Sequence, residues 1–208
     1  SICCKQKKFK LEFKNIINIG VPGSIDKTRR DYFKILKYYE SLKREKNQFN
    51  LIFIGSFASN KPGTQGRKNQ YFNKVVKEIE RLQSQGFNII YFNKKLPQKE
   101  FNKYTKLSDI MLTCMNLDSY MDRGWTAVYT ESIYYNKYLL TNRVNSPKNI
   151  SYIENYYSDK KSFYKKIIYF KSYRKKILKK NYEIINKYFG QNKYAKKISN
   201  IIYSVIKD

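Results

Sequence analysis

The amino-acid sequence predicts an α/β fold, an open parallel sheet with helices on both faces and a helical tail at the C-terminus. Two observations support this prediction. Short apolar runs alternate with longer stretches in which apolar residues recur every three or four positions. The run LIFIGSF at 51–57 is almost wholly apolar, as is typical of a strand covered on both faces. Strands and helices alternating at this spacing form right-handed βαβ units, so the sheet is expected to be Rossmann-like.

The predicted elements follow one another in a regular order. The first strand, at 15–25, ends in a Pro-Gly turn, and the helix at 26–46 has Asp26 or Thr28 as its cap. After the strand at 51–57 come a helix at 70–85, a strand at 88–92, a short helix from Pro97 to about Leu107, a strand at 109–115, a helix at 126–135 and a strand at 138–141.

Size and composition indicate a globular unit with a buried core. The chain has 208 residues, of which 41% are hydrophobic and 17% aromatic, and this excludes intrinsic disorder. No apolar run approaches the roughly 20 residues that a membrane-spanning helix needs. The three cysteines form no disulfide framework, which favours a reducing, cytoplasmic location. The chain begins at Ser1 without a methionine, which suggests a piece of a longer protein.

The net charge is the most unusual feature of the composition. Lys and Arg number 43 and Asp and Glu 16, which gives +27. A basic surface attracts phosphate on nucleic acid, on anionic lipid or on a nucleotide, and peripheral attachment to the inner face of the cytoplasmic membrane is one form of this. The alternative is compositional bias, since Lys, Asn, Ile and Tyr are all abundant.

The organisation changes near the C-terminus. Residues 158–208 contain 15 Lys and Arg but 3 Asp and Glu, in a mostly helical pattern. Their apolar stripes predict packing on the sheet or on a missing partner domain, with a membrane-surface or nucleic-acid tail as the alternative. The expected divisions are 1–14 as a linker or the end of a missing N-terminal domain, 15–157 as the Rossmann-like domain, and 158–208 as C-terminal helices packed on it.

Two segments have the composition of an anion site. Ligands of open α/β sheets bind at the carboxyl ends of the strands, where the strand order reverses. After the first strand, Gly23 allows the backbone to approach an anion closely, and Arg29 and Arg30 add positive charge.

The second segment precedes the helix at 126–135. Gly124 lies before it, and the backbone N–H groups of Thr126 and Ala127 would point at an anion. Glu131 in the same helix offers a carboxylate to a ribose hydroxyl. The alternative is that Gly23 and Gly124 only form turns and that Glu131 is a solvated helix residue.

Several other chemistries are disfavoured. The sequence has no histidine, so no Ser-His-Asp or Cys-His pair exists within it, and the absence of a CxxC pair argues further against zinc. No GxGxxG follows a strand, which disfavours nicotinamide or flavin binding. No Asp-x-Asp pair is present, which argues against a metal-dependent nucleotide-sugar site.

The residues at 16–142 resemble the C-terminal, donor-binding domain of a GT-B fold glycosyltransferase of the bacterial group 1, family 4-like type. VPGSIDKTRRDYFKIL resembles the first strand, glycine turn and basic helix start of that family, and LIFIGSF its second strand with a terminal glycine, Gly55. NIIYFNKKLPQKEFNKYTKLSDIMLTCM resembles the third strand, nucleobase loop and fourth strand. GWTAVYTESIYYNKYLLTN is similar to the segment that holds the diphosphate and ribose.

The resemblance implies a role for each matching residue. Glu131 would bind the ribose. It matches the second of two glutamates that the family often has with seven residues between them, whereas the first position is Arg123 here. Ser24 stands where many members have an arginine. The residues implied to bind the diphosphate are Gly23, Ser24, Arg29, Arg30, Gly124, Thr126 and Ala127, and those implied to touch the nucleobase are Leu96 and Pro97.

The implied function is transfer of a sugar, of hexosyltransferase type, from a UDP- or GDP-type nucleotide sugar to a polysaccharide, glycolipid or similar acceptor. The resemblance implies no metal and no catalytic residue in this chain, and acceptor groups in a missing N-terminal domain. The chain alone is then expected to bind nucleotide without turnover. Two alternatives remain open: a basic, non-catalytic α/β module that binds nucleic acid or an anionic membrane, and a hydrolase or epimerase of nucleotide sugars.

Overall fold

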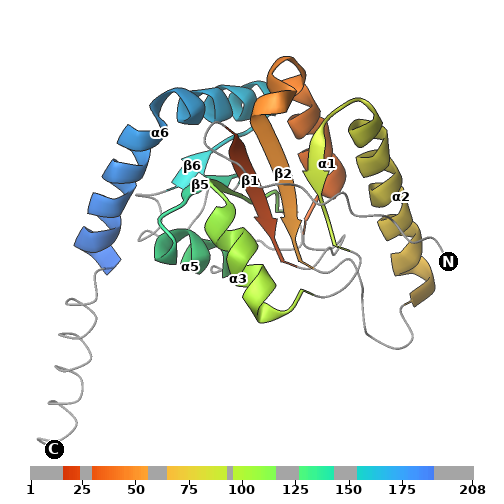
Figure 1. The fold of residues 1–208 in the computed structure, drawn as a ribbon, viewed down its shortest axis with the longest axis horizontal. Coiled ribbons are helices and arrows are strands. Elements are labelled where there is room, and N and C mark those ends of the chain that lie inside the picture. Colours follow the sequence, from red (N-terminus) through yellow and green to blue (C-terminus); the bar gives the residue numbers. More distant parts are fainter. Residues whose placement is uncertain are drawn as a thin grey trace, which may run out of the picture.

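Six parallel strands form the centre of the structure. The computed structural model describes residues 16–23, 30–55, 65–92, 96–115, 127–142 and 154–189, and the described strands pair in the order β3-β2-β1-β4-β5-β6 (Figure 1). They are β1 (Ile17–Pro22), β2 (Phe49–Ile54), β3 (Asn88–Ile90), β4 (Ile110–Leu112), β5 (Tyr138–Thr141) and β6 (Glu154–Tyr156). All five neighbouring pairs are parallel. The predicted α/β class with an open parallel sheet is confirmed.

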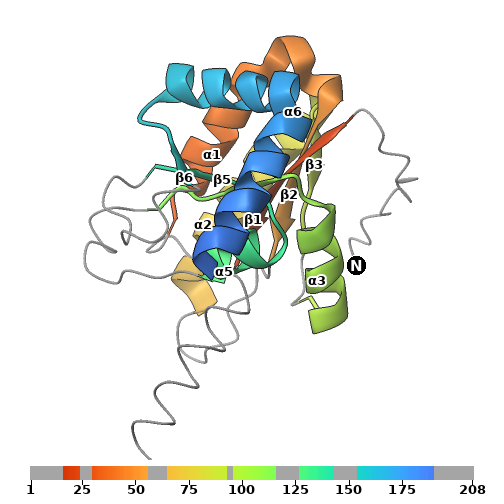
Figure 2. The ribbon, with the colours of Figure 1, turned by 90° about the vertical axis from the view of Figure 1, so that its left-hand side faces the viewer.

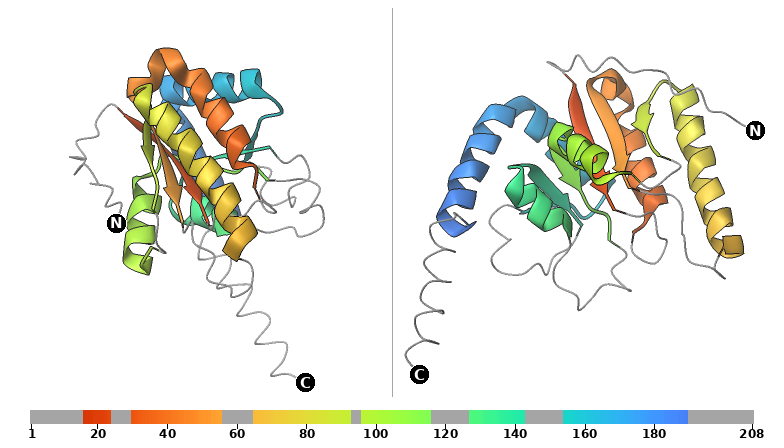
Figure 3. Two further views of the ribbon diagram at one scale, coloured as in Figure 1. Left: turned by 90° about the vertical axis from the view of Figure 1, so that its right-hand side faces the viewer. Right: turned by 60° about the horizontal axis from the view of Figure 1, so that its bottom comes forward.

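Helices cover both faces of this sheet. Figure 3 shows α1 and α2 on one face and α3 and α5 on the other. The described helices are α1 (Tyr32–Tyr39), the 3-10 helix η1 (Glu40–Gln48), α2 (Gln65–Ser84), α3 (Gln98–Leu107), α5 (Ala127–Tyr134) and α6 (Lys160–Phe189). Every residue of β1, β2, β4 and β5 is buried, because parallel strands covered on both faces have no side that meets water.

The long helix α6 crosses from one face of the sheet to the other (Figures 1 and 2). Its first half buries Phe163, Ile167 and Phe170 in the larger apolar cluster, together with α1 and α2. Its second half packs Ile184 and Ile185 against a smaller apolar cluster on the other face. This cluster consists of Met111, Val128, Tyr129 and Leu139, and Val128 and Tyr129 belong to α5. The helix bends at Tyr173, where the backbone leaves the helical range with φ −120 and ψ 21. The C-terminal segment up to 189 is therefore packed on the sheet domain.

A paired polar cluster closes the amino edge of the sheet. Asp109, just before β4, accepts the backbone N–H of Asn18 at 3.0 Å and forms an ion pair with Arg174. Asn50 donates to the side-chain oxygen of Asn18 at 2.9 Å. Burial raises the pKa of Asp109, while the Asn18 donor and the Arg174 charge oppose this rise. Since Arg174 follows the bend in α6, the ion pair fixes the point at which this helix changes faces.

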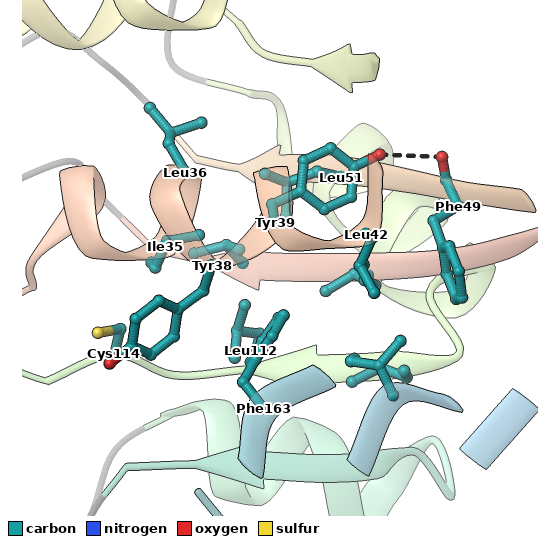
Figure 4. Close-up of a cluster of buried hydrophobic side chains, with 14 of the residues drawn as sticks. Ile35, Leu36, Tyr38, Tyr39, Leu42, Phe49, Leu51, Leu112, Cys114 and Phe163 are labelled. Carbon is teal, nitrogen blue, oxygen red and sulfur yellow. Dashed lines mark hydrogen bonds between the residues drawn. The ribbon is translucent and has the colours of Figure 1, made fainter. Parts of the chain in front are cut away.

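Aromatic side chains fill the space between α1 and the sheet. Figure 4 shows Tyr38, Tyr39 and Phe163 among the aliphatic residues of this cluster. The Tyr39 hydroxyl, fully buried, lies 2.9 Å from the carbonyl of Phe49 and 3.0 Å from that of Asn88. Tyr39 thereby links α1 to the first residue of β2 and the first residue of β3.

The helix predicted at 26–46 differs from the observed structure. Within the described residues it begins at Tyr32, because Asp31 caps it by accepting the N–H of Lys34 at 2.9 Å. The proposed caps, Asp26 and Thr28, lie outside the described residues. From Glu40 the chain continues as a 3-10 helix that leaves helical geometry at Leu42 and Glu45.

Smaller differences concern the strands. The strand predicted at 51–57 runs from 49 to 54. The sixth strand, β6, was not predicted, because its sequence ENY lacks the apolar run that marks the buried strands.

We expect Tyr39→Phe to lower the free energy of unfolding by about 1 kcal/mol, because it removes a donor from two carbonyls in the sheet. For a chain of this size this corresponds to a Tm lower by about 2 to 4 °C in a thermal melt. Tyr182→Phe is the matched control, since Tyr182 is 57% exposed and should be neutral. Equal melting temperatures for both variants would contradict the role given to the Tyr39 hydroxyl.

Candidate functional site

The strand order reverses between β1 and β4, and the candidate site lies at the carboxyl ends of these two strands. Such a reversal opens a crevice in which ligands of α/β sheets bind. Gly23 directly follows β1, and Met115 follows β4. Arg30 returns to this point and pairs with Met115 in an antiparallel bridge. The N–H of Asp31 also donates to the carbonyl of Cys114 at 3.1 Å.

Two glycines bring backbone and guanidinium close together. Gly23 has φ +105, and its N–H donates to the carbonyl of Ile54 at 2.8 Å. A Cβ on Gly55 would lie 2.1 Å from the carbonyl oxygen of Gly23, so only glycine fits there. A Cβ on Gly23 would lie 3.0 Å from both Nη atoms of Arg30. The guanidinium therefore lies directly against the backbone at the end of β1.

The side chain of Asn142 fixes the segment with which Arg30 pairs. Asn142 follows β5 and is buried; its Oδ1 accepts the N–H of Met115, and its Nδ2 donates to the carbonyl of Met115, both at 2.9 Å. These two bonds hold Met115 in place, and Met115 in turn holds Arg30. Sequence reasoning missed this residue, because a single asparagine after a strand has no distinguishing motif.

Glu131 of α5 lies near this arginine and has an unusual acidity. Burial raises the pKa of its carboxyl to about 7, and the positive charge of Arg30 lowers it in part. The two side chains do not form an ion pair within the described part of the chain. The carboxyl group therefore changes its protonation state near neutral pH rather than near pH 4.5.

Both charged groups contain a buried atom that lacks a hydrogen-bond partner among the described residues. These atoms are Nη1 of Arg30 and Oε2 of Glu131. The other charged side chain of this kind, Glu45, differs because its Oε1 accepts the hydroxyl of Tyr164 at 3.0 Å. An unpaired donor and an unpaired acceptor at the same edge of the sheet are costly unless water or a ligand completes them.

The structure thus brings together three of the predicted site residues, Gly23, Arg30 and Glu131. Ala127 begins α5, four residues before Glu131. Ser24, Arg29, Gly124 and Thr126 lie outside the described residues.

Leu96 and Pro97 lie between β3 and α3, and Pro97 occupies the N-cap position of α3. They follow the carboxyl end of β3, two strands away from β1, which corresponds to about 10 Å across the sheet.

A separate hollow of about 420 Å³ lies over the outer side of α3. It is lined by Lys99, Asn102, Lys103, Lys106 and Leu107. It does not include the residues of the crevice.

Comparisons with known proteins give matches in structure. No protein-family model matches the sequence, and no curated protein matches it significantly. The C-terminal domain of the group 1 glycosyl transferase LpcC from Francisella tularensis superposes with a TM-score of 0.64 at 14% identity, over 84% of this chain and 87% of that one. A trehalose-6-phosphate structure from E. coli, bound with UDP-2-fluoro glucose, gives 0.63 at 15% identity. The fold is that of the C-terminal domain of a GT-B glycosyltransferase.

This GT-B domain fold is present in longer proteins as well. The chain covers 44% of the E. coli protein, with 91% of its own length matched. A putative UDP-N-acetylglucosamine 2-epimerase from Listeria monocytogenes gives a TM-score of 0.60 at 11% identity, with 94% of this chain and 47% of that one covered. The chain therefore spans less than half of these two proteins, and the likeness shows the fold rather than the reaction.

Glu131→Gln should stabilise the protein at alkaline pH. Because the folded-state pKa of about 7 lies above the ordinary 4.5, the folded state binds this proton more tightly, and stability falls as pH rises through this window. At pH 8 the variant should be more stable by about 1 to 3 kcal/mol, with little difference at pH 4.5. Thermal melts at both values measure this, with the exposed Glu80→Gln as control. A difference that is the same at both pH values would contradict the buried environment of Glu131.

Proposed function

We propose that this chain is the donor-binding domain of a glycosyltransferase that transfers a sugar from a nucleoside-diphosphate sugar to a polysaccharide, glycolipid or similar acceptor. The observation that supports this best is the meeting of Arg30 and Glu131 in the crevice, each with an unpaired buried atom. A nucleotide sugar has complementary groups, because its diphosphate accepts hydrogen bonds and its ribose hydroxyls donate them.

The diphosphate would bind on the side of Arg30. Its guanidinium and the backbone at Gly23 offer positive charge and close approach, and Asn142 holds this arrangement through Met115. Negative charge develops on the leaving nucleoside diphosphate during transfer, and a preorganised cation stabilises it without a metal ion. Ser24, Arg29, Gly124, Thr126 and Ala127 complete the proposed diphosphate site.

The nucleoside would extend toward Glu131 and the segment before α3. The ionised carboxylate accepts the ribose hydroxyls, and Leu96 and Pro97 contact the base. The E. coli protein of this fold is bound with a UDP sugar, which favours a UDP-type donor here. Transfer also needs an acceptor site, for which we propose a second domain, since the longer proteins of this fold are about twice the length matched here. The isolated chain should then bind the donor without hexosyl transfer.

A nucleotide-sugar epimerase is the second candidate, favoured by the similarity to the Listeria protein. Both candidates require the same donor pocket. A transferase moves the sugar to an acceptor and releases the nucleoside diphosphate, whereas an epimerase inverts one stereocentre of the sugar. Product analysis of a complete enzyme therefore separates the two.

A thermal-shift panel tests the pocket itself. UDP, GDP, dTDP, CMP and their common sugar conjugates are added at about 150 mM salt, where surface charge is screened. One nucleotide should stabilise the chain selectively, by about 2.7 kcal/mol when it is present at a hundred times its Kd. Arg30→Ala should abolish the shift.

Arg44→Ala is the matched control, because Arg44 is an exposed arginine of η1. It should keep the full response. A folded chain that responds to no nucleotide, or a response lost equally in both variants, would overturn the proposed donor pocket.

Nucleotide-sugar affinity should rise with pH between 6 and 8. The ionised carboxylate of Glu131 accepts ribose hydroxyls at both oxygens and with its negative charge, and protonation turns one of these acceptors into a donor. Its pKa of about 7 places this change within the range. Calorimetric titration with a UDP sugar measures it, because both phosphates of such a donor are esterified and do not titrate there. Below pH 7 the affinity should fall by up to about tenfold for each pH unit. In Glu131→Gln the affinity should be low and independent of pH, and a pH dependence that persists would contradict the assignment.

A further inference from the structure

Positive charge is unevenly distributed over the helices. In the second half of α6, residues 174–187 include six basic residues and one acidic residue. The stretch 70–84 of α2 is of similar length and has three basic and two acidic residues. The first half of α6 is similarly basic, since residues 160–173 contain five lysines and no acidic residue. The excess is therefore a property of α6 as a whole relative to α2.

The second half of α6 is held with its lysines outward. Arg174 pairs with Asp109, and the carbonyl of Leu178 accepts the side chain of Asn136 at 3.1 Å. Ile184 and Ile185 pack inward. The exposed lysines on the opposite side of this helix are Lys175, Lys176, Lys179, Lys180 and Lys187.

The basic surface continues onto α3. Lys137, in the turn before β5, donates to the carbonyl of Lys106 at 2.6 Å, and the neighbouring Asn136 bonds to α6. This turn joins the two helices, and Figure 2 shows them on the same side of the molecule. Three lysines of α3, Lys99, Lys103 and Lys106, line the hollow of about 420 Å³ together with Leu107. We call the exposed lysines of α3 and of 174–187 the basic face.

Exposed tyrosines accompany these lysines. Tyr134, at the end of α5, is 78% exposed, and Tyr182 of α6 is 57% exposed. Tyrosine has an apolar ring and a polar hydroxyl, a combination that favours the boundary between lipid headgroups and acyl chains. Lysine stems extend along such a boundary while their ammonium groups reach the phosphates.

We propose that the basic face docks on an anionic lipid surface. The lysines of α6 and α3 contact lipid phosphates, the hollow over α3 accepts a headgroup, and Tyr134 and Tyr182 lie at the interface. Glu100 and Glu183 are the acidic residues of the described helices on this face, and Glu100 is already paired with Lys103 at 3.6 Å. The proposal does not depend on nucleotide binding in the crevice.

The kind of cation favours lipid over nucleic acid. Base-specific recognition of nucleic acid favours arginine, whose planar fork binds phosphates and bases in a bidentate manner. The arginine of 174–187 is committed to Asp109, and the exposed cations of this face are lysines. Point charges of this kind suit the diffuse negative potential of an anionic membrane.

Co-sedimentation with vesicles tests the proposal. The full chain is mixed with vesicles of phosphatidylcholine alone or with about 30% phosphatidylglycerol, at low salt and at about 150 mM salt. Binding should require phosphatidylglycerol and weaken as salt rises. The variant with Lys175, Lys176, Lys179 and Lys180 all changed to Glu should bind at least a hundredfold more weakly, since each lysine contributes about fivefold.

The matched control reverses four exposed lysines on the opposite face, Lys37, Lys43, Lys74 and Lys77, to Glu. It has the same net charge as the test variant. If its vesicle affinity falls by less than about tenfold, the position of the lysines determines binding rather than the total charge. Tyr134→Ser with Tyr182→Ser leaves the charge unchanged and should weaken binding at least fivefold. Thermal melts confirm that each variant is folded, and Arg30→Ala should bind vesicles like the parent.

Three results would overturn the proposal. The first is that the chain does not bind anionic vesicles at low salt. The second is that the test and control variants lose vesicle affinity equally. The third is that the chain still binds a single-stranded oligonucleotide at about 150 mM salt, where it no longer binds vesicles. Since Arg30→Ala separates the crevice from the basic face, failure here would leave the proposed donor site standing.

Discussion

The pairing of β1 with β2 on one side and with β4 on the other determines where this protein can have a functional site. All six residues of β1 are buried, and helices cover both faces of the strand. Polar chemistry is therefore excluded from the middle of the sheet and confined to the two edges where strands begin and end. The same pairing sets the reversal in strand order, because the chain leaves β1 for β2 in one direction and reaches β4 in the other.

Buried charges are paired at the amino edge of the sheet and partly unpaired at its carboxyl edge. At the amino edge, Asp109 has partners for both carboxylate oxygens, and one of them, Arg174, locks the bend of α6. At the carboxyl edge, Arg30 and Glu131 each retain a buried atom without a partner in the described residues. Paired charges of the first kind explain the path of the chain, whereas the unpaired atoms of Arg30 and Glu131 leave a donor and an acceptor available to a ligand. This contrast, rather than fold similarity alone, supports the carboxyl edge as the functional one.

Much of the fold could be predicted from the sequence, because buried parallel strands and amphipathic helices leave strong periodic signals. The short polar strand β6 left none. For the site, the residue types pointed to Gly23, Arg30 and Glu131, and the structure places Gly23 and Glu131 near Arg30. Their role in binding stays a prediction. The contacts that the sequence did not reveal are long-range. They are the hydrogen bonds between Asn142 and Met115, and the β-bridge between Arg30 and Met115 at a position where a helix was expected. A local pattern cannot report such contacts, since the partners lie 27 and 85 positions apart in the sequence.

The large positive charge has two different physical meanings in this molecule. Arg30 is partly buried beside backbone at the end of β1, so its field acts in a medium of low polarity and is little affected by salt. The lysines of α6 stand in water, where each is weak alone and all are screened together. Recognition of a small diphosphate needs the first kind of charge, and attraction to an extended anionic surface needs the second. Salt should therefore dissociate one interaction and leave the other, which allows two phosphate-binding surfaces to operate independently on one domain.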